Sequence, residues 1–314
     1  MSVNGQPATL TATASGIRLN NVPCGAATVA STDSIAITGS AFNDVVTLTN
    51  DFAPGATAEG GASEIEISVS LGGGNDTLKA SLGAGDDVAV FTASGIDMFG
   101  DGDQDIALDP ASTEHVSVLG GPGADIIDGA LYPDALGLHG NAGDDVVIGG
   151  PVQDHLYGED GNDTLEGGGG TDRLFGGPGD DVEDGGDGHD QFRQESAADG
   201  ADTLIGGGGQ DRVFYDKRSV GVSVTLDDGQ ANDGAPGEGD DIAVDVEHVM
   251  GGGGDDVLIG SDVRNTLEGN GGDDFLQGKV GRDLLDCGAG TDEAVGGPDT
   301  NDDIIRSDCE TATE

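Results

Sequence analysis

One apolar position recurs every nine residues through much of the chain, set among polar and glycine-rich stretches. Residues 140–193 divide into six consecutive nonapeptides, from GNAGDDVVI to GGDGHDQFR. The eighth residue is apolar in five of the six units, with Glu183 as the exception, and the sixth is always aspartate. A second block of five units covers 251–295 and is apolar at every eighth position. A fixed period of this kind predicts a repeat architecture.

Each nonapeptide predicts a six-residue turn followed by a three-residue strand. Glycines at positions one, two and four permit left-handed backbone angles, so the chain can reverse tightly there. The last three residues predict a short strand whose middle, apolar side chain points inward.

The sixth positions form a regular series of acidic side chains. The first block has Asp145, Asp154, Asp163, Asp172, Asp181 and Asp190, and the second has Asp256, Asn265, Asp274, Asp283 and Asp292. Further copies of the unit carry Asp202 and Asp211 between the blocks, and Asp125 and Asp134 upstream of them. Weaker copies lie around Asp44, Asp76 and Asp87, so the signal fades toward the N-terminus.

Composition excludes several classes of protein. Sixty glycines, 4 % aromatic residues and a formal charge of -50 leave too little large apolar surface for a conventional layered globule. Such an acidic chain will not bind nucleic acid or an anionic membrane surface, and no apolar run is long enough for membrane insertion. Two interpretations remain, a disordered acidic chain or a repeat protein neutralised by cations, and the periodicity favours the second.

The units resemble G-G-x-G-x-D-x-U-x, the nonapeptide of RTX (repeats-in-toxin) calcium-binding proteins. The stretches VFYDKRSVGVSVTLDDGQ and LLDCGAGTDEAV also resemble bacterial members of that family. The resemblance implies an all-β fold, a right-handed parallel β-roll or β-helix solenoid in which two nonapeptides complete one coil. It also implies several bound Ca²⁺ ions and a secreted or cell-surface location.

Stacked coils create an electrostatic problem that calcium would solve. Loops 18 residues apart would stack at about 4.8 Å, which places Asp145, Asp163 and Asp181 on one edge and Asp154, Asp172 and Asp190 on the other. Unit charges about 4 Å apart repel by about 1 kcal/mol in water and about 4 kcal/mol at an effective dielectric constant of 20. Calcium suits the gap because it accepts six to eight oxygen ligands in flexible geometry.

The resemblance implies specific ligands, carbonyls of positions one and three in one loop and of two and four in the next, bridged by the sixth-position carboxylates. One site would use Gly158, Asp160 and Asp163 with Gly177, Gly179 and Asp181, and another Gly167, Gly169 and Asp172 with Gly186, Gly188 and Asp190. The second block would pair Asp256 with Asp274, Asn265 with Asp283, and Asp274 with Asp292. Asn265 weakens its site, and Val152 departs from glycine in the Asp154 loop. The alternative is that the aspartates only form turns and solubilise the chain.

The remaining segments complete the predicted domain organisation. Residues 1–70 form an irregular N-terminal β section that caps the solenoid, or a separate small β domain, because alternating runs occur at 35–38, 45–48 and 65–69. The rest divides into degenerate repeats (71–139), a first roll (140–214), a strand with an acidic loop (215–250), and a second roll with a cysteine-bearing cap (251–314). The acidic loop is interpreted as a solvated excursion, with binding of calcium or a partner as the alternative. Cys287 and Cys309 would close that cap as a disulfide or remain buried thiols, and a disulfide implies an oxidising compartment.

The sequence therefore predicts an extracellular calcium-binding repeat protein, held by stacked Ca²⁺ ions, with a structural or adhesive role. It predicts no enzyme, because neither H-E-x-x-H nor G-x-S-x-G occurs. The alternatives are a surface module that binds polysaccharide or mineral, and a divergent carbohydrate-active enzyme on a β-helix. Calcium is the predicted partner, and the sequence names neither a cell-surface or polysaccharide partner nor an oligomeric state.

Overall fold

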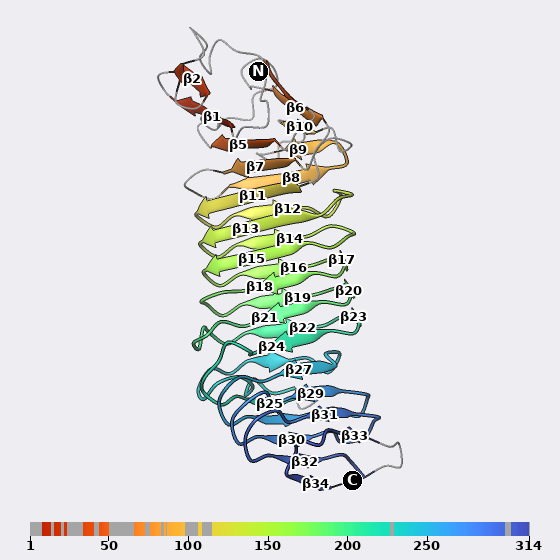
Figure 1. The fold of residues 1–314 in the computed structure, drawn as a ribbon. Coiled ribbons are helices and arrows are strands. Elements are labelled where there is room, and N and C mark those ends of the chain that lie inside the picture. Colours follow the sequence, from red (N-terminus) through yellow and green to blue (C-terminus); the bar gives the residue numbers. More distant parts are fainter. Residues whose placement is uncertain are drawn as a thin grey trace. The chain divides into compact units, whose positions relative to one another are not determined.

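The computed structural model consists of strands and turns that belong to two compact units, Met1–Gly158 and Glu159–Glu314. It describes residues 8–13, 16–19, 22–23, 34–40, 44–49, 66–72, 76–82, 85, 87–97, 106–108, 115–226, 229–298 and 303–313. The predicted all-β class and the parallel roll are confirmed, because most of the strand pairs in each unit are parallel and follow one another as successive rungs (Figure 1).

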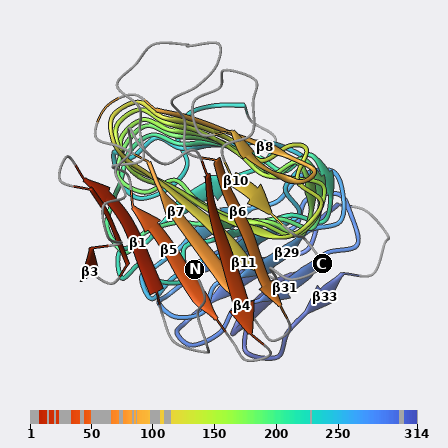
Figure 2. The ribbon, with the colours of Figure 1, turned by 90° about the horizontal axis from the view of Figure 1, so that it is seen from above.

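The first unit has two sheets. One runs in the order β3 (Val22–Pro23), β2 (Gly16–Leu19), β1 (Ala8–Thr13), β5 (Val45–Thr49), β7 (Thr77–Ser81), β11 (His115–Pro122) and β13 (Leu136–Ala142). From β1 onward its pairs are parallel, and Figure 2 shows β1, β5 and β7 side by side. The other runs β4 (Ser34–Ser40), β6 (Glu66–Gly72), β10 (Ile106–Leu108), β9 (Gly95–Asp97), β8 (Val88–Thr92), β12 (Ile126–Asp128) and β14 (Val146–Ile148). The three predicted N-terminal strands lie in β4, β5 and β6, although residue 65 is outside the described residues.

Strand β15 (His155–Asp160) contains the division between the units, and β16 opens the second unit. One parallel sheet of this unit comprises β18 (Arg173–Phe175), β21 (Gln191–Arg193), β24 (Arg212–Phe214), β27 (His248–Met250), β29 (Thr266–Glu268), β31 (Leu284–Asp286) and β33 (Ile304–Ile305). A second comprises β16 (Thr164–Glu166), β19 (Val182–Asp184), β22 (Thr203–Ile205) and β26 (Asp241–Ile242). A third comprises β25 (Ser223–Thr225), β28 (Val257–Ile259), β30 (Phe275–Gln277), β32 (Glu293–Val295) and β34 (Thr311–Thr313). The turns add β17 (Gly169–Gly170), β20 (Asp187–Gly188) and β23 (Gly208–Gly209).

The core of the second unit consists mainly of columns of eighth-position side chains. In the first sheet, Leu174 pairs with Phe192, Phe192 with Val213, and the column continues through Val249, Leu267 and Leu285. All six side chains are fully buried. Burying one such side chain stabilises the fold by roughly 1.5–3 kcal/mol, so a three-residue strand contributes through its middle residue.

Glu183 occupies the same inward position as these apolar residues. It pairs in register with Leu165 on one side and Leu204 on the other, and it is fully buried. The period of two along a strand leaves its side chain no outward alternative. Its carboxyl accepts a hydrogen bond of 3.4 Å from the Gln194 amide.

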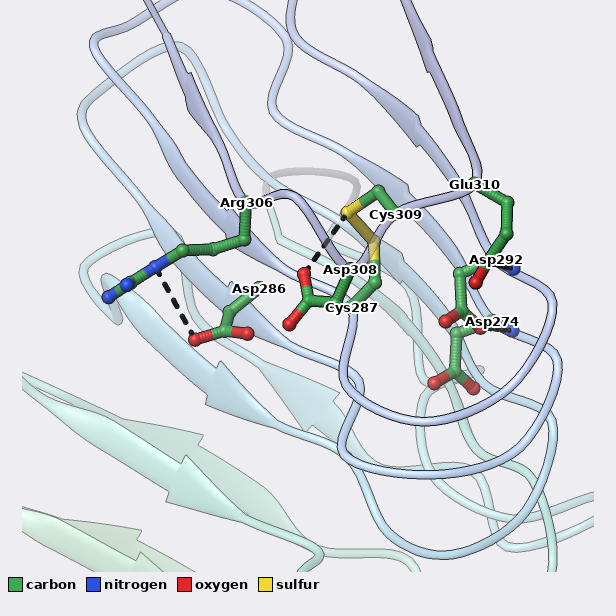
Figure 3. Close-up of a disulfide and its surroundings, with 8 residues drawn as sticks. All are labelled: Asp274, Asp286, Cys287, Asp292, Arg306, Asp308, Cys309 and Glu310. Carbon is green, nitrogen blue, oxygen red and sulfur yellow. Dashed lines mark hydrogen bonds and ion pairs between the residues drawn. A yellow bond between two sulfur atoms is a disulfide. The ribbon is translucent and has the colours of Figure 1, made fainter.

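The two cysteines of the C-terminal cap form a disulfide, Cys287–Cys309, with the Cα atoms 5.3 Å apart (Figure 3). The predicted pairing is therefore confirmed. The bond joins the residue that follows β31 to the segment that precedes β34, so the last strand is covalently held to the roll.

Candidate metal centre

The sixth-position carboxylates form hydrogen-bonded ladders along the stacked loops. In each ladder the backbone N–H of one sixth-position residue donates to Oδ1 of the next. The bond is 2.7 Å from Asp163 to Asp181 and 2.8 Å from Asp172 to Asp190, each across 18 residues. The sixth-position side chain, which precedes the strand, is therefore buried within the loop, and the N–H donor fixes its orientation.

The same bond recurs through the rest of the second unit. In the second block it joins Asp256 to Asp274 and Asp274 to Asp292 at 2.8 Å, and Asn265 to Asp283 at 2.8 Å. Between the blocks it joins Asp181 to Asp202 at 3.0 Å and Asp190 to Asp211 at 2.8 Å.

Within the described part of the chain, the second carboxylate oxygen, Oδ2, is buried and has no hydrogen-bond partner in several of these residues. They are Asp181, Asp190, Asp211, Asp274 and Asp292. A buried polar oxygen without a donor is costly, and the cost is larger for a charged group. A cation in the gap between loops would remove that cost, so these atoms are the strongest indication of a ligand.

Burial acts directly on the acidity of these groups. It raises the pKa of Asp181 to about 7, with neighbouring acidic groups adding to the effect. It raises the pKa of Asp211 to about 7 and that of Asp202 to about 8. Because a nearby cation favours the charged form of a carboxyl group, cation binding in these loops would displace protons.

Glycine makes room for the carboxylate and brings the loops together. A Cβ on Gly176 would collide with Oδ2 of Asp181, which is the sixth residue of the same unit. A Cβ on Gly179, where φ is +149°, would collide with the carbonyl oxygen of Gly161 in the neighbouring loop. Carbonyl oxygens thus lie close against the next loop, where they can serve as ligands.

The donor set fits calcium. Within the described residues no place gathers three or more His, Cys, Asp or Glu side chains, so a site here would combine few carboxylates with backbone carbonyls. Carboxylate and carbonyl oxygens together are the ligands that Ca²⁺ takes.

The predicted side chains differ in how the structure places them. The buried ones are Asp125, Asp145, Asp154, Asp163, Asp172, Asp181, Asp190, Asp202, Asp211, Asp256, Asn265, Asp274, Asp283 and Asp292. Asp125 accepts from the N–H of Asp87 and donates its own N–H to Asp145, each at 2.7 Å. Asp134 is half-buried, and the N–H that donates to Asp154 comes instead from Leu136, at 2.7 Å.

The predicted loop residues are more accessible than the aspartates. Gly158 and Gly167 are buried, Asp160 is exposed, and Gly169, Gly177, Gly179, Gly186 and Gly188 are half-buried. The Gly186 carbonyl accepts the N–H of Gly208 at 2.7 Å, and the Gly168 carbonyl accepts that of Asp187 at 2.8 Å. A carbonyl oxygen has two lone pairs, so these bonds leave capacity for a metal ion.

Four acidic residues outside the nonapeptides continue the ladders. The N–H of Asp202 donates to Asp240, that of Asp211 to Glu247, that of Asp283 to Asp303, and that of Asp292 to Glu310. Figure 3 shows Glu310 beyond Asp292 and Asp274 in the same column. Each of these four acidic residues is the first of three residues whose third member is apolar. Those third residues are Ile242, Val249, Ile305 and Ala312. A search for the glycine pattern of the repeat does not detect these triplets.

A second ladder lies at the fifth position, and its donors and acceptors are reversed. Here the side chain of the earlier loop accepts the N–H of the next loop, whereas at the sixth position the N–H of the earlier loop is the donor. The bonds join Asp180 to Asn162, Thr291 to Asp273, and Gln210 to Nδ1 of His189, at 2.8–2.9 Å. These bonds involve exposed residues, so they align the loops outside the buried carboxylates.

Comparison with protein families supports the interpretation of the loops. The model of the RTX calcium-binding nonapeptide repeat (4 copies) matches residues 138–156, 149–183, 157–192, 196–217, 250–285 and 268–302. A search of curated proteins found no match. In the part of the chain that the structure describes, no helix has the length and hydropathy to cross a membrane.

Proposed function

Since residues 138–302 carry the calcium-binding nonapeptide repeats of the RTX family, we propose an extracellular protein held together by stacked Ca²⁺ ions, with a structural or adhesive role. The single observation that carries the proposal is the row of buried Oδ2 atoms without a donor, which includes Asp181 and Asp190 on the two edges. The proposed role is non-catalytic.

The proposed ligands of one site come from two successive loops. Asp172 and Asp190 would supply carboxylate oxygens, and Gly167, Gly169, Gly186 and Gly188 would supply carbonyls. The N–H of Asp172 orients the Asp190 carboxylate through a 2.8 Å bond, which leaves Oδ2 of Asp190 for the metal. When bound, calcium supplies the positive charge that this acidic stack otherwise lacks.

The proposed mechanism couples folding to calcium concentration. In low calcium, the buried carboxylates must take up protons or repel one another, which opposes the stacking that the strands and the hydrogen-bonded ladders favour. In high calcium, ion binding and folding share one free energy. Extracellular calcium modules bind with dissociation constants of about 10⁻⁴–10⁻³ M, so the fold would form after export. The Cys287–Cys309 disulfide supports an oxidising location.

The test is a calcium titration of the full chain, followed by circular dichroism and repeated with a chelator. We expect a cooperative gain of β signal with calcium and its loss on chelation. Magnesium at the same concentration serves as the control and should produce little change, because it prefers a smaller octahedral site with retained water. Identical spectra with calcium and with chelator would contradict the proposal.

A further inference from the structure

Arg218 is a buried cation among acidic side chains of the second unit. Its side chain is 1 % exposed, and all three guanidinium nitrogens are bonded. Nη2 donates to Asp199 and to Glu238, each at 2.7 Å, and Nη1 donates to Glu238 at 2.9 Å. Nε donates to the Glu195 carbonyl at 2.5 Å.

The two carboxylate partners belong to successive loops of one stack. The ladder passes from Asp181 to Asp202 and then, at 3.2 Å, to Asp240. Asp202 and Asp240 are therefore the sixth positions of neighbouring loops. Counting back along the chain, Asp199 is the third position of the first loop and Glu238 the fourth position of the second. In the repeat loops, the third position of one loop and the fourth of the next are those whose carbonyls are proposed to face calcium.

We propose that the guanidinium of Arg218 is the chain's own cation at this level of the stack, where it joins the Asp199–Asp202 loop to the Glu238–Asp240 loop without calcium. The inference uses the proposed calcium role of the other loops as its point of comparison, and its test can fail separately from that role.

Arg218 is suited to the position by geometry and by charge. A planar guanidinium presents its donors in a fixed fork that two carboxylates and a carbonyl can share, which an ammonium group cannot match. The pKa of Arg218 is raised, because bonds to Glu238 and the charges of Glu238 and Asp199 outweigh burial. Burial would raise the pKa of Glu238, but the pKa is lowered because the bonds to Arg218, Asp199 and Ala235 and the charge of Arg218 together outweigh burial.

Further bonds fix the segment around Arg218. The Tyr215 hydroxyl donates to Asp240 at 2.7 Å, and the carbonyl of Arg218 accepts the N–H of Gly253 at 2.8 Å. Glu238 also accepts N–H groups from Asp199 and Ala235. The predicted solvated loop therefore has a buried, ion-paired centre, which the sequence alone did not indicate.

The test is hydrogen–deuterium exchange of the full chain, in calcium and in chelator, read by mass spectrometry. In wild type we expect peptides covering 195–202 and 233–242 to keep their protection in chelator, while repeat loops such as 272–292 lose theirs. In Arg218→Ala, the 195–202 and 233–242 peptides should exchange at least tenfold faster in chelator and regain protection in millimolar calcium. That rescue is expected because two facing carboxylates are left in a gap that a divalent ion can enter.

Two further variants keep the result interpretable. Arg212→Ala removes an exposed arginine of the same unit and should leave both peptides unchanged. Glu238→Gln retains the size of the side chain and should accelerate exchange of both peptides in chelator by a smaller factor than Arg218→Ala. It keeps the proposal testable if Arg218→Ala folds poorly.

Two outcomes would overturn the proposal. In one, wild-type 195–202 and 233–242 lose protection in chelator as fully as the repeat loops. In the other, Arg218→Ala exchanges equally fast with and without calcium, which would mean that Arg218 only packs. If instead exchange of the repeat-loop peptides is the same in calcium and in chelator, the proposed function fails. The effect of Arg218→Ala in chelator still tests this inference.

Discussion

The repeat loops and the 215–250 segment solve the same electrostatic problem with different means. Among the described residues of the repeat loops, Asp190 and Asp274 each have a buried Oδ2 without a hydrogen-bond partner. At the level of the 215–250 segment, Glu238 of that segment and Asp199 of the preceding loop each contact the Arg218 guanidinium at 2.7 Å. The cation that we propose between the repeat loops therefore has a counterpart here, a guanidinium that the chain supplies itself.

A guanidinium of the chain and a bound calcium ion differ in whether the positive charge can leave the loops. A guanidinium on the chain is present at every calcium concentration, and its pKa keeps it charged throughout the physiological range. A bound ion leaves when its concentration falls, so stability gained from it depends on mass action. The two proposals together predict a calcium-responsive roll in which the Arg218 level stays joined in low calcium.

The largest expected effect concerns a third, covalent means of closing the stack, at the C-terminus. Cys287→Ala with Cys309→Ala opens a loop closed by residues 22 apart, and should lower the free energy of unfolding by about 3 kcal/mol. Urea unfolding in saturating calcium measures the loss.

Hydrogen exchange of the same variant locates the loss of stability along the chain. We expect residues 284–313, which contain β31 and β34, to lose protection, and residues 195–242 to keep theirs. Equal losses in both regions would mean that the unit unfolds as one block, and the levels of the stack would not be separable.

The second effect concerns Glu183, a buried acid with no cation beside it. Burial raises the pKa of Glu183 well above its usual value. Its favourable contribution is therefore complete below the unfolded pKa of about 4.3 and decreases as pH rises toward the folded pKa. Glu183→Leu should raise the free energy of unfolding by about 1–2 kcal/mol at pH 8 and by less at pH 5.

Paired urea titrations at the two pH values measure this effect, with Glu183→Gln as the control that keeps size and removes only ionisation. Glu183→Gln should also be less sensitive to pH than wild type. A gain in Glu183→Leu that is larger at pH 5 than at pH 8 would contradict the assignment.

The third effect separates hydrogen bonding from metal binding in one repeat loop. Asp190→Asn keeps an oxygen for the N–H of Asp172 and replaces the oxygen proposed to bind calcium. The calcium midpoint by circular dichroism should rise roughly 3- to 10-fold, or about 1 kcal/mol. Asp180→Asn makes the same chemical change at an exposed fifth position and should leave the midpoint nearly unchanged. Equal shifts in the two variants would indicate only a general charge effect.

The smallest effect concerns the repeat position at which the chain already lacks an acid. The N–H of Asn265 donates to Asp283, and its side-chain oxygen accepts the N–H of Ser261 at 2.7 Å. Asn265→Asp adds a charged ligand, so the calcium midpoint should fall roughly twofold and the chelator-treated protein should become less stable. An unchanged midpoint would remove this loop from the proposed sites.

The nine-residue period was enough to predict the strands and much of the candidate site. A buried eighth position, as at Leu174, and a carboxylate at the sixth, as at Asp190, both follow from the repeat. The period could not find Asp240 or Glu247, because the loops before them have other lengths and lack the glycine pattern. Only strand register shows that these residues follow Asp202 and Asp211 in their ladders.

By itself, the sequence predicted the inward column and the acidic loops, since each depends on neighbours a fixed distance apart along the chain, and its resemblance to the RTX repeat implied the all-β parallel roll. The pairing of Cys287 with Cys309 was open in the sequence and was decided by the packing of the last coil. Tertiary structure alone decided that Arg218 is buried and lies between Asp199 and Glu238. The physical reason is that burial and ion pairing depend on which loops become neighbours in space, and irregular loop lengths hide that information from the chain's local pattern.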